Sequence, residues 1–145
     1  MKYKVASVVA FVLLVACGAW MWSTGSLLAN GPVTIAVQVA AVLLMIWALL
    51  TFKLRSFHAS ADPTSGGIVT TGPYRFIRHP IYAAVFYFLF AGAAAHPGVQ
   101  GLSAAVLAAV MLFIRMRSEE ILLIQRYPEY GPYAARTSRI LPRVF

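Results

Sequence analysis

Acidic residues and cysteine are scarce in this chain, which has four Asp or Glu and one Cys among its 145 residues. The single cysteine, Cys17, excludes an intrachain disulfide and a dithiol redox cycle. Charged residues make up 11% of the chain and hydrophobic residues 61%, whereas a soluble domain carries about a quarter charged residues. So large an apolar excess does not fit a compact soluble core, and it indicates a membrane protein.

Charge is also missing from long continuous runs. Residues 5–22, 33–52 and 98–114 carry none, and each run is long enough to cross the hydrocarbon layer, which takes about 17–25 helical residues. A fourth uncharged run, 81–95, is shorter. It either begins near residue 79 with polar groups reaching the interface, or it is re-entrant. The runs predict an all-α, polytopic integral membrane protein with about four transmembrane helices.

The twelve Lys and Arg residues give a net charge of +8, which in a soluble protein would suggest nucleic-acid binding. Their distribution favours another explanation. They stand before the first run, between the second and third, and after the fourth, whereas the connections 23–32 and 96–97 contain none. With four spans every cation falls on one side, so both termini are predicted to be cytoplasmic (on the inner membrane, in a bacterium). Membrane lipids, and no nucleic acid, are the expected partners.

Cys17 itself has two interpretations. Residues 14–17, Leu-Val-Ala-Cys, resemble a lipoprotein cleavage site after a short apolar region. The apolar run continues beyond Cys17 to Trp22, however, and short targeting motifs often match by chance. A cysteine inside a membrane helix is the favoured interpretation.

The two halves of the chain differ in character. Residues 1–52 contain two plain spans and few polar groups, so we expect a scaffold there. Residues 53–145 contain a polar loop, a hairpin closed at 96–98, a fourth helix extending to about residue 127 and an interfacial tail. Pro80 fits the first turn of the third helix, where its missing N–H costs nothing. We therefore expect one membrane-embedded domain, residues 1–145, in which residues 53–145 are the half that carries the chemistry.

Polar residues gather at the cytoplasmic end of this hairpin. Arg115 and Glu119 are four residues apart and share a helix face, with Glu120 100° round the helix. If the two helices lie side by side, these residues meet an arginine, an imidazole and a phenol in residues 78–82. The plainer alternatives are topology signals for the arginines, a solvated face for the glutamates and a helix cap for His79.

The order of these features resembles a known family. Gly-Pro-Tyr at 72–74 leads to Arg-His-Pro-x-Tyr at 78–82, then come a hairpin, Arg115 with glutamates at 119–120, and a Tyr/Arg/Pro tail over 130–142. This ordered set resembles the isoprenylcysteine carboxyl methyltransferase family and the wider group that includes phospholipid methyltransferases. The resemblance covers roughly residues 64–142.

The resemblance implies S-adenosylmethionine as the cofactor, held between the third and fourth helices and the preceding loop. The positions that it carries over to cofactor binding are Gly67, Ile68, Val69, Tyr74, His79, Pro80, Tyr82 and Glu119. Arg115 matches a position that handles the methyl acceptor, which makes it substrate-binding and catalytic. The chain departs from the family at Ala84, where glycine is frequent, and at Gly66 and Gly67, which replace bulkier loop residues.

The residue chemistry agrees with a zwitterionic cofactor. Glu119 and Glu120 can hold its ammonium group, and Arg78 or His79, with the start of the third helix, can hold its carboxylate. Tyr74 and Tyr82 offer aromatic faces to the adenine or the sulfonium.

The absence of an obvious general base bears on the methyl acceptor. A carboxylate with a pKa near 4 is already ionised at neutral pH, so methylating an isoprenylcysteine-like or other lipophilic acid needs no base. A phospholipid amine or a small thiol would need deprotonation, with His79 as the catalytic helper.

Two other classes of protein stay open at this point. A small exporter would need an acidic residue inside a span, and all four acids lie outside the runs. A non-catalytic membrane scaffold would leave the motif and the paired glutamates as coincidence. No metal site is expected, because His58 and His96 belong to separate segments.

Overall fold

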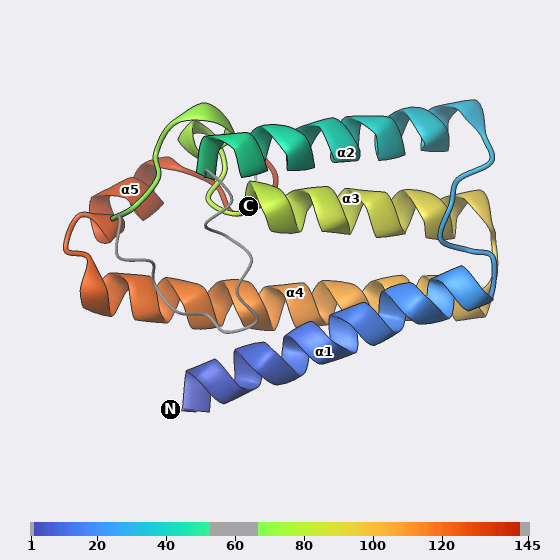
Figure 1. Cartoon of the computed structure of the whole chain (residues 1–145), viewed down its shortest axis with the longest axis horizontal. Coiled ribbons are helices and arrows are strands. Elements are labelled where there is room, and N and C mark those ends of the chain that lie inside the picture. The colour runs from blue at the N-terminus through green and yellow to red at the C-terminus, as the bar shows by residue number, and fades with distance from the viewer. Residues whose placement is uncertain (1, 53–66, 143–145) are drawn as a thin grey trace.

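The computed structural model describes residues 2–52 and 67–142, and every regular element in those ranges is a helix (Figure 1). In chain order the elements are α1 (Lys2–Ser23), α2 (Pro32–Phe52), the short 3₁₀ helix η1 (Gly72–Arg75), α3 (Pro80–Ala95), α4 (Val99–Arg126) and α5 (Tyr130–Arg136). The all-α prediction is confirmed, as are the start of the third helix at Pro80 and the extension of the fourth beyond Arg115.

Helices α1, α2 and α4 are long and apolar enough to cross a membrane. Helix α3 is the shorter apolar run of the sequence: its 16 residues span about 24 Å, against about 30 Å of hydrocarbon. Large apolar side chains such as Trp22, Val33 and Leu50 point outward from α1 and α2. Such faces are stable against lipid, and the chain is a membrane protein.

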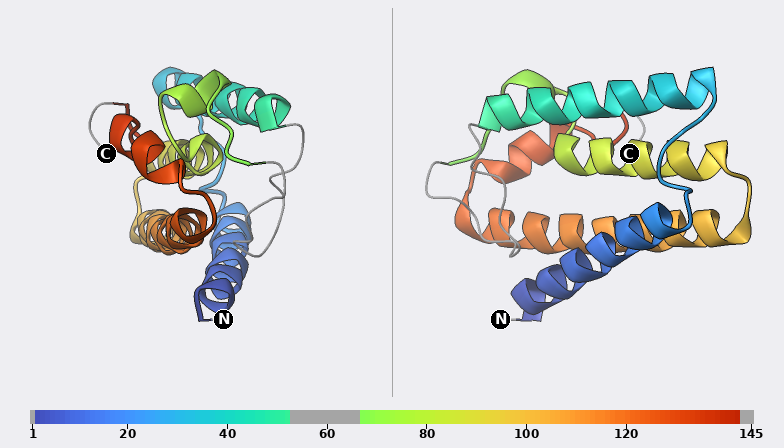
Figure 2. Two further views of the ribbon diagram at one scale, coloured as in Figure 1. Left: turned by 90° about the vertical axis from the view of Figure 1, so that its left-hand side faces the viewer. Right: turned by 45° about the vertical axis from the view of Figure 1, so that its right-hand side comes forward.

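Each of the helices α1 to α4 runs antiparallel to the next in the chain, so the molecule has two distinct ends (Figure 1). Helix α1 packs on α4, α2 packs on α3, and α3 lies beside α4; the views in Figure 2 show the same arrangement. We call the end that carries residues 78–82, 115–120 and 134–140 the polar end. The end that carries the connections 24–31 and 96–98 is the loop end.

Two glycines allow close packing at the loop end. A Cβ atom on Gly92 of α3 would lie 2.2 Å from the carbonyl oxygen of Leu27, and one on Gly101 of α4 would lie 3.0 Å from Cβ of Ser26. The α1–α2 connection therefore sits in a notch that only glycine leaves open. The amide of Gln38 fastens the same connection, because its Nε2 donates to the carbonyl oxygens of Leu27 (2.7 Å) and Phe88 (3.0 Å).

The small residues of α4 also serve a contact that the sequence did not reveal. Ala104, Ala105 and Ala108 pack against Cys17 and Met21 of α1, together with residues of α3. The close approach thus joins α4 to α1 as well as to its hairpin partner α3. The Cys17 side chain is buried in this cluster.

Candidate active site

The start of α3 places His79 and Tyr82 beside each other. Pro80 occupies the first turn, and His79 stands at the N-cap position without a side-chain capping hydrogen bond. Its ring stacks on that of Tyr82, with 5.5 Å between the ring centroids. His79 thus holds the N-cap position, but its imidazole does not cap the helix and lies instead beside Glu119 and Glu120 of α4.

The C-terminal tail runs alongside the residues before α3. Ile77 and Ser138 form a parallel bridge. The backbone N–H groups of Arg78 and His79 donate to the carbonyl oxygens of Ser138 (2.7 Å) and Arg139 (3.0 Å). These bonds satisfy main-chain donors ahead of the helix and bring the tail to the polar end.

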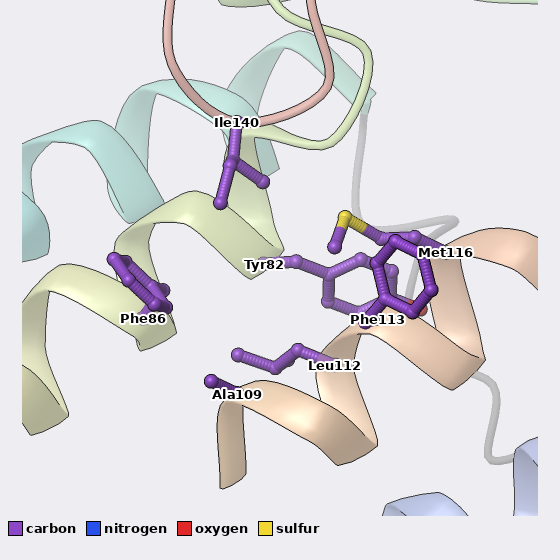
Figure 3. Close-up of a pocket in the computed structure, with 7 residues that line it drawn as sticks. All are labelled: Tyr82, Phe86, Ala109, Leu112, Phe113, Met116 and Ile140. Atoms are coloured by element: carbon purple, nitrogen blue, oxygen red, sulfur yellow. The ribbon is translucent and has the colours of Figure 1, made fainter. Parts of the chain in front are cut away.

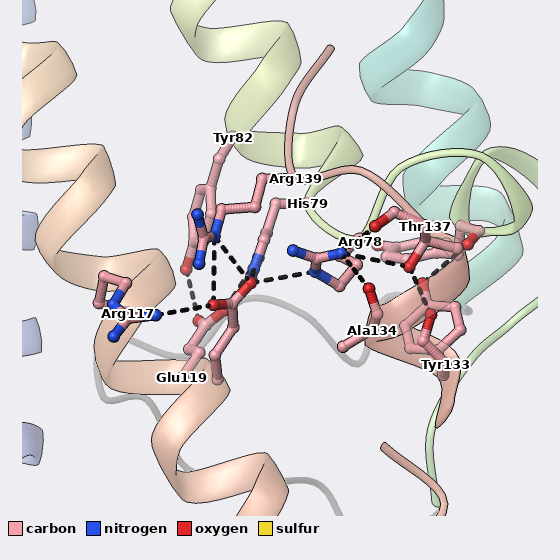
Figure 4. Close-up of polar contacts among 11 residues, drawn as sticks. Arg78, His79, Tyr82, Arg117, Glu119, Tyr133, Ala134, Thr137 and Arg139 are labelled. Carbon is pink, nitrogen blue, oxygen red and sulfur yellow. Dashed lines mark hydrogen bonds and ion pairs between the residues drawn. The ribbon is translucent and has the colours of Figure 1, made fainter. Parts of the chain in front are cut away.

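Figure 4 shows the polar contacts of Arg78, His79 and Arg139, and these three side chains converge on the carboxylate of Glu120. Glu120 is 5% exposed. Its carboxylate accepts from Nε of Arg78 (3.0 Å) and from Nε of Arg139 (3.2 Å to each oxygen). Nε2 of His79 lies 3.3 Å away, and the half-exposed Arg117 adds a longer contact at 3.7 Å. A buried carboxylate needs such partners, and Glu120 thereby joins α4 to α3 and to the tail.

Arg78 also binds the backbone around the end of α5. Its Nη1 donates to the carbonyl oxygens of Ala134 (2.8 Å) and Thr137. The sequence predicted Arg78 as a cofactor residue, whereas the anchoring of α5 was missed. Arg139 was also missed as a partner of Glu120. The one available signal in the sequence was that half of its acidic residues are adjacent, in a chain with many arginines that could pair with them.

Glu119 is less enclosed than Glu120. Its side chain is 26% exposed, Oε2 lies 3.6 Å from Nδ1 of His79, and Oε1 lies 4.0 Å from Nη2 of Arg115. The Tyr82 hydroxyl donates to the same Oε1 atom. Of the two glutamates, Glu119 is therefore the one with a carboxylate that a bound molecule can reach.

Arg115 is 3% exposed and connects three helices. Its Nη1 donates to the carbonyl oxygen of Ser7 in α1 (2.9 Å), and its Nε donates to the Tyr82 hydroxyl (3.2 Å). The guanidinium lies over the rings of Phe11 (5.0 Å) and Tyr82 (5.6 Å), where cation–π attraction adds to the hydrogen bonds. The contact with α1 was not predicted.

An apolar pocket between α3 and α4 adjoins these polar groups (Figure 3). Its cavity volume is about 90 Å³, and it is lined by Tyr82, Phe86, Ala109, Leu112, Phe113, Met116 and Ile140. Ile140 comes from the tail, and its carbonyl oxygen accepts from the Tyr87 hydroxyl at 2.9 Å. Tyr82 belongs to both regions, since its ring lines the pocket and its hydroxyl binds Glu119.

Tyr74 lies apart from the glutamates, on the side of α2 and α5. It is buried in η1, its ring is 5.7 Å from that of Phe52, and its carbonyl oxygen accepts from the Tyr133 hydroxyl at 2.7 Å. Burial raises the pKa of Tyr133 to about 12, so this phenol stays a neutral donor. Gly67, Ile68 and Val69 lie in the segment before η1, and Gly66 is outside the described residues.

His96 is separate from this site. Nε2 of His96 lies 2.7 Å from the carbonyl oxygen of Leu28 at the loop end, and His58 is outside the described residues. Within residues 2–52 and 67–142, no three His, Cys, Asp or Glu side chains are grouped as a metal ion would need.

Membrane-length helices, a buried charge network and an adjoining apolar pocket define an integral membrane protein with a polar site at one end of the bundle. The chain matches the model of the phospholipid methyltransferase family over residues 26–130 and belongs to that family. It is thus a member of a family of membrane methyltransferases, as the ordered motif predicted.

Two curated relatives are similar to this chain. The nickel-cobalt-cadmium resistance protein NccN of Alcaligenes xylosoxydans xylosoxydans is 31% identical over 97% of the chain, which covers 62% of that protein. The cobalt-zinc-cadmium resistance protein CzcN of Cupriavidus metallidurans is 33% identical over 78 residues, 53% of the chain and 36% of that protein. The chain therefore spans about three fifths of the length of NccN. Its match to CzcN covers a smaller part of that protein.

Proposed function

We propose that this chain is an S-adenosylmethionine-dependent methyltransferase that methylates the carboxylate of a lipophilic, isoprenylcysteine-like acceptor. The observation that carries the proposal is the pairing of Glu119 and Arg115, with opposite charges 4.0 Å apart, beside Tyr82 and the apolar pocket. Family membership supports methyl transfer in general. The site supports a zwitterionic cofactor and an apolar acid side by side.

The donor set fits the cofactor's amino-acid group. Glu119 would hold the ammonium group, and Arg78 with the start of α3 would hold the carboxylate. Glu120 has both oxygens engaged by cations, which favours a positioning role for it and leaves the ammonium to Glu119. The resemblance adds Pro80 and the segment 67–69 to the cofactor site, whereas Tyr74, which it also names, lies apart from the glutamates with its ring against Phe52.

When bound, the cofactor supplies an electrophilic methyl group on its sulfonium, and the protein's task is to align an oxygen with it and exclude water. Arg115 is suited to aligning a carboxylate, because a guanidinium can hold both of its oxygens in one plane. Its Nε and Nη1 are themselves held by Tyr82 and Ser7, so the group has a fixed orientation. The apolar side chains that line the pocket, Phe86 and Ile140 among them, keep water away from the reacting groups.

A phospholipid amine is the second candidate acceptor, favoured by the description of the family. An amine must lose a proton, and His79 is the one group at the site suited to take it. Both of its ring nitrogens already face carboxylate oxygens, at 3.6 and 3.3 Å. That engagement favours the carboxylate acceptor, and the same argument applies to a small thiol.

The test is a methylation assay on purified protein with S-adenosylmethionine labelled in its methyl group. The acceptors are N-acetyl-S-farnesylcysteine, phosphatidylethanolamine and dithiothreitol. A methyl ester releases methanol in alkali, whereas N-methyl and S-methyl products do not. We expect alkali-labile label with the farnesylcysteine alone. Alkali-stable label in the lipid would show that the acceptor is the phospholipid amine. Failure to bind S-adenosylhomocysteine would contradict the proposal that the chain is a methyltransferase.

We also propose that the polar end faces the cytoplasm, with both termini there. The structure suggests how to test this orientation, because Asn30 is exposed at the loop end whereas Ser26 is buried. In a Cys17→Ala background, Asn30→Cys should react with an impermeant maleimide added outside cells. Reaction from the cytoplasmic side alone would overturn the orientation.

A further inference from the structure

Helix α5 carries two buried tyrosines in different situations. The Tyr133 hydroxyl donates to the carbonyl oxygen of Tyr74. Tyr130 is 2% exposed, yet its hydroxyl has no hydrogen-bond partner in the part of the chain that the structure describes. A buried polar group without a partner destabilises a fold, because it has lost its hydrogen bonds to water. The Tyr130 hydroxyl therefore lowers the stability of the free protein, unless a bound molecule accepts its hydrogen bond.

The surroundings of Tyr130 indicate what such a molecule would present. Arg78 donates through Nη1 to the carbonyl oxygen of Ala134, one turn along α5 from Tyr130. Its Nε is bound to Glu120, and its Nη2 makes no hydrogen bond or ion pair with the described residues. The charges of Glu120 and Arg78 are both felt at the Tyr130 hydroxyl, so an arginine end and a phenol offer two donors near the same charge network.

The protonation state of Tyr130 fits the role of a donor. Burial is the main cause that raises its pKa above the ordinary value, and the carboxylate of Glu120 is the next. The phenol is therefore neutral at any physiological pH and can donate its proton to an acceptor. A neutral donor beside an arginine suits an anion, because an ammonium group has no lone pair to accept with.

We propose that the Tyr130 hydroxyl donates a hydrogen bond to the α-carboxylate of the bound cofactor, alongside Arg78. This inference rests on the proposed function, which places the amino-acid end of S-adenosylmethionine between Glu119 and Arg78. The hydroxyl is pre-organised by the packing of its ring on Tyr133, at 5.8 Å between centroids. A donor held ready in this way loses little entropy when the ligand arrives.

The test compares Tyr130→Phe with Tyr133→Phe, using two ligands that differ in one group. S-adenosylhomocysteine has the α-carboxylate, and its decarboxylated analogue, S-adenosyl-3-thiopropylamine, lacks it. Tyr130→Phe should weaken S-adenosylhomocysteine about tenfold, the loss of one hydrogen bond, and leave the analogue's affinity unchanged. Its melting temperature without ligand should equal or exceed that of the wild type. Tyr133→Phe should melt lower and show no such preference between the ligands.

Each other result has a definite meaning. Unchanged affinity for S-adenosylhomocysteine in Tyr130→Phe would mean that a buried water or nothing satisfies the hydroxyl, and the inference would be wrong. Equal weakening of both ligands would reduce Tyr130 to a packing residue. A Tyr130→Phe protein that melts lower without ligand would show that the hydroxyl already has a partner. A wild type that binds neither ligand would contradict the proposed function itself, which the other three results leave standing.

Discussion

At the two ends of the helix bundle, different interactions hold other segments of the chain against α3 and α4. At the loop end the α1–α2 connection fits a notch at Gly92 and is fastened by the neutral amide of Gln38. At the polar end the tail is held by arginines converging on the buried carboxylate of Glu120. At the loop end, contacts between uncharged groups hold the structure together and have no further role. The charged end combines structure with groups of the kind that a zwitterionic ligand requires.

The largest effect should follow removal of the charge at the centre of the polar end. Glu120→Gln leaves Arg78 and Arg139 without their counter-charge, and breaking a buried ion pair costs about 3–5 kcal/mol. We expect a much lower melting temperature in detergent and rapid proteolysis of the tail beyond residue 136. Glu129→Gln is the matched control, because Glu129 is exposed. Similar melting of the two variants would mean that Glu120 does not hold the polar end together.

The next effect tests whether Arg115 acts by geometry or only by charge. A lysine cannot reach Ser7 and Tyr82 together as the guanidinium does, nor hold two carboxylate oxygens. Arg115→Lys should lower turnover about a hundredfold and bind S-adenosylhomocysteine within a few-fold of wild type. Arg117→Lys, on the half-exposed neighbour, is the control and should keep its turnover. An Arg115→Lys protein with full turnover would leave Arg115 with a structural role alone, in joining α4 to α1 and α3.

A smaller effect should separate the two adjacent glutamates. Glu119→Gln removes a charge-assisted hydrogen bond to the ligand's ammonium group, worth about 1.5–3 kcal/mol, or roughly ten- to a hundredfold in affinity. Its melting temperature should change far less than that of Glu120→Gln, since Glu119 is more exposed. Calorimetric titration with S-adenosylhomocysteine measures the first quantity. Equal affinities of Glu119→Gln and Glu129→Gln would show that Glu119 does not contact the cofactor.

The smallest effect concerns the loop end. Gly92→Ala places a Cβ 2.2 Å from the carbonyl oxygen of Leu27, and the forced shift should cost about 1–3 kcal/mol. Gly18→Ala is the matched control, because nothing lies within 4 Å of its added Cβ and alanine favours a helix. Affinity for S-adenosylhomocysteine should stay the same in both variants. Weaker binding by Gly92→Ala would show that the two ends are coupled.

Local sequence patterns predicted the helices and part of the site. Pro80 marked the start of α3, and the spacing of Arg115 and Glu119 placed them on one face of α4. The contact of Arg115 with Ser7 could not be predicted, because every residue has a backbone carbonyl and its sequence position carries no signal. The buried, unpartnered hydroxyl of Tyr130 was equally hidden, since burial depends on which helices meet.

By itself the sequence determined that this chain is a helical membrane protein, and it predicted the charged groups at one end. Uncharged runs long enough to span a membrane, and cations confined to one side, can both be recognised in the local sequence. The bilayer makes these properties decisive for helix formation and orientation. Only the tertiary structure decided that Glu120 serves the fold while Glu119 stays accessible. The two residues are neighbours in sequence and chemically identical. Their rotation by 100° about α4 turns one toward Arg78 and Arg139 and the other toward Tyr82 and Arg115.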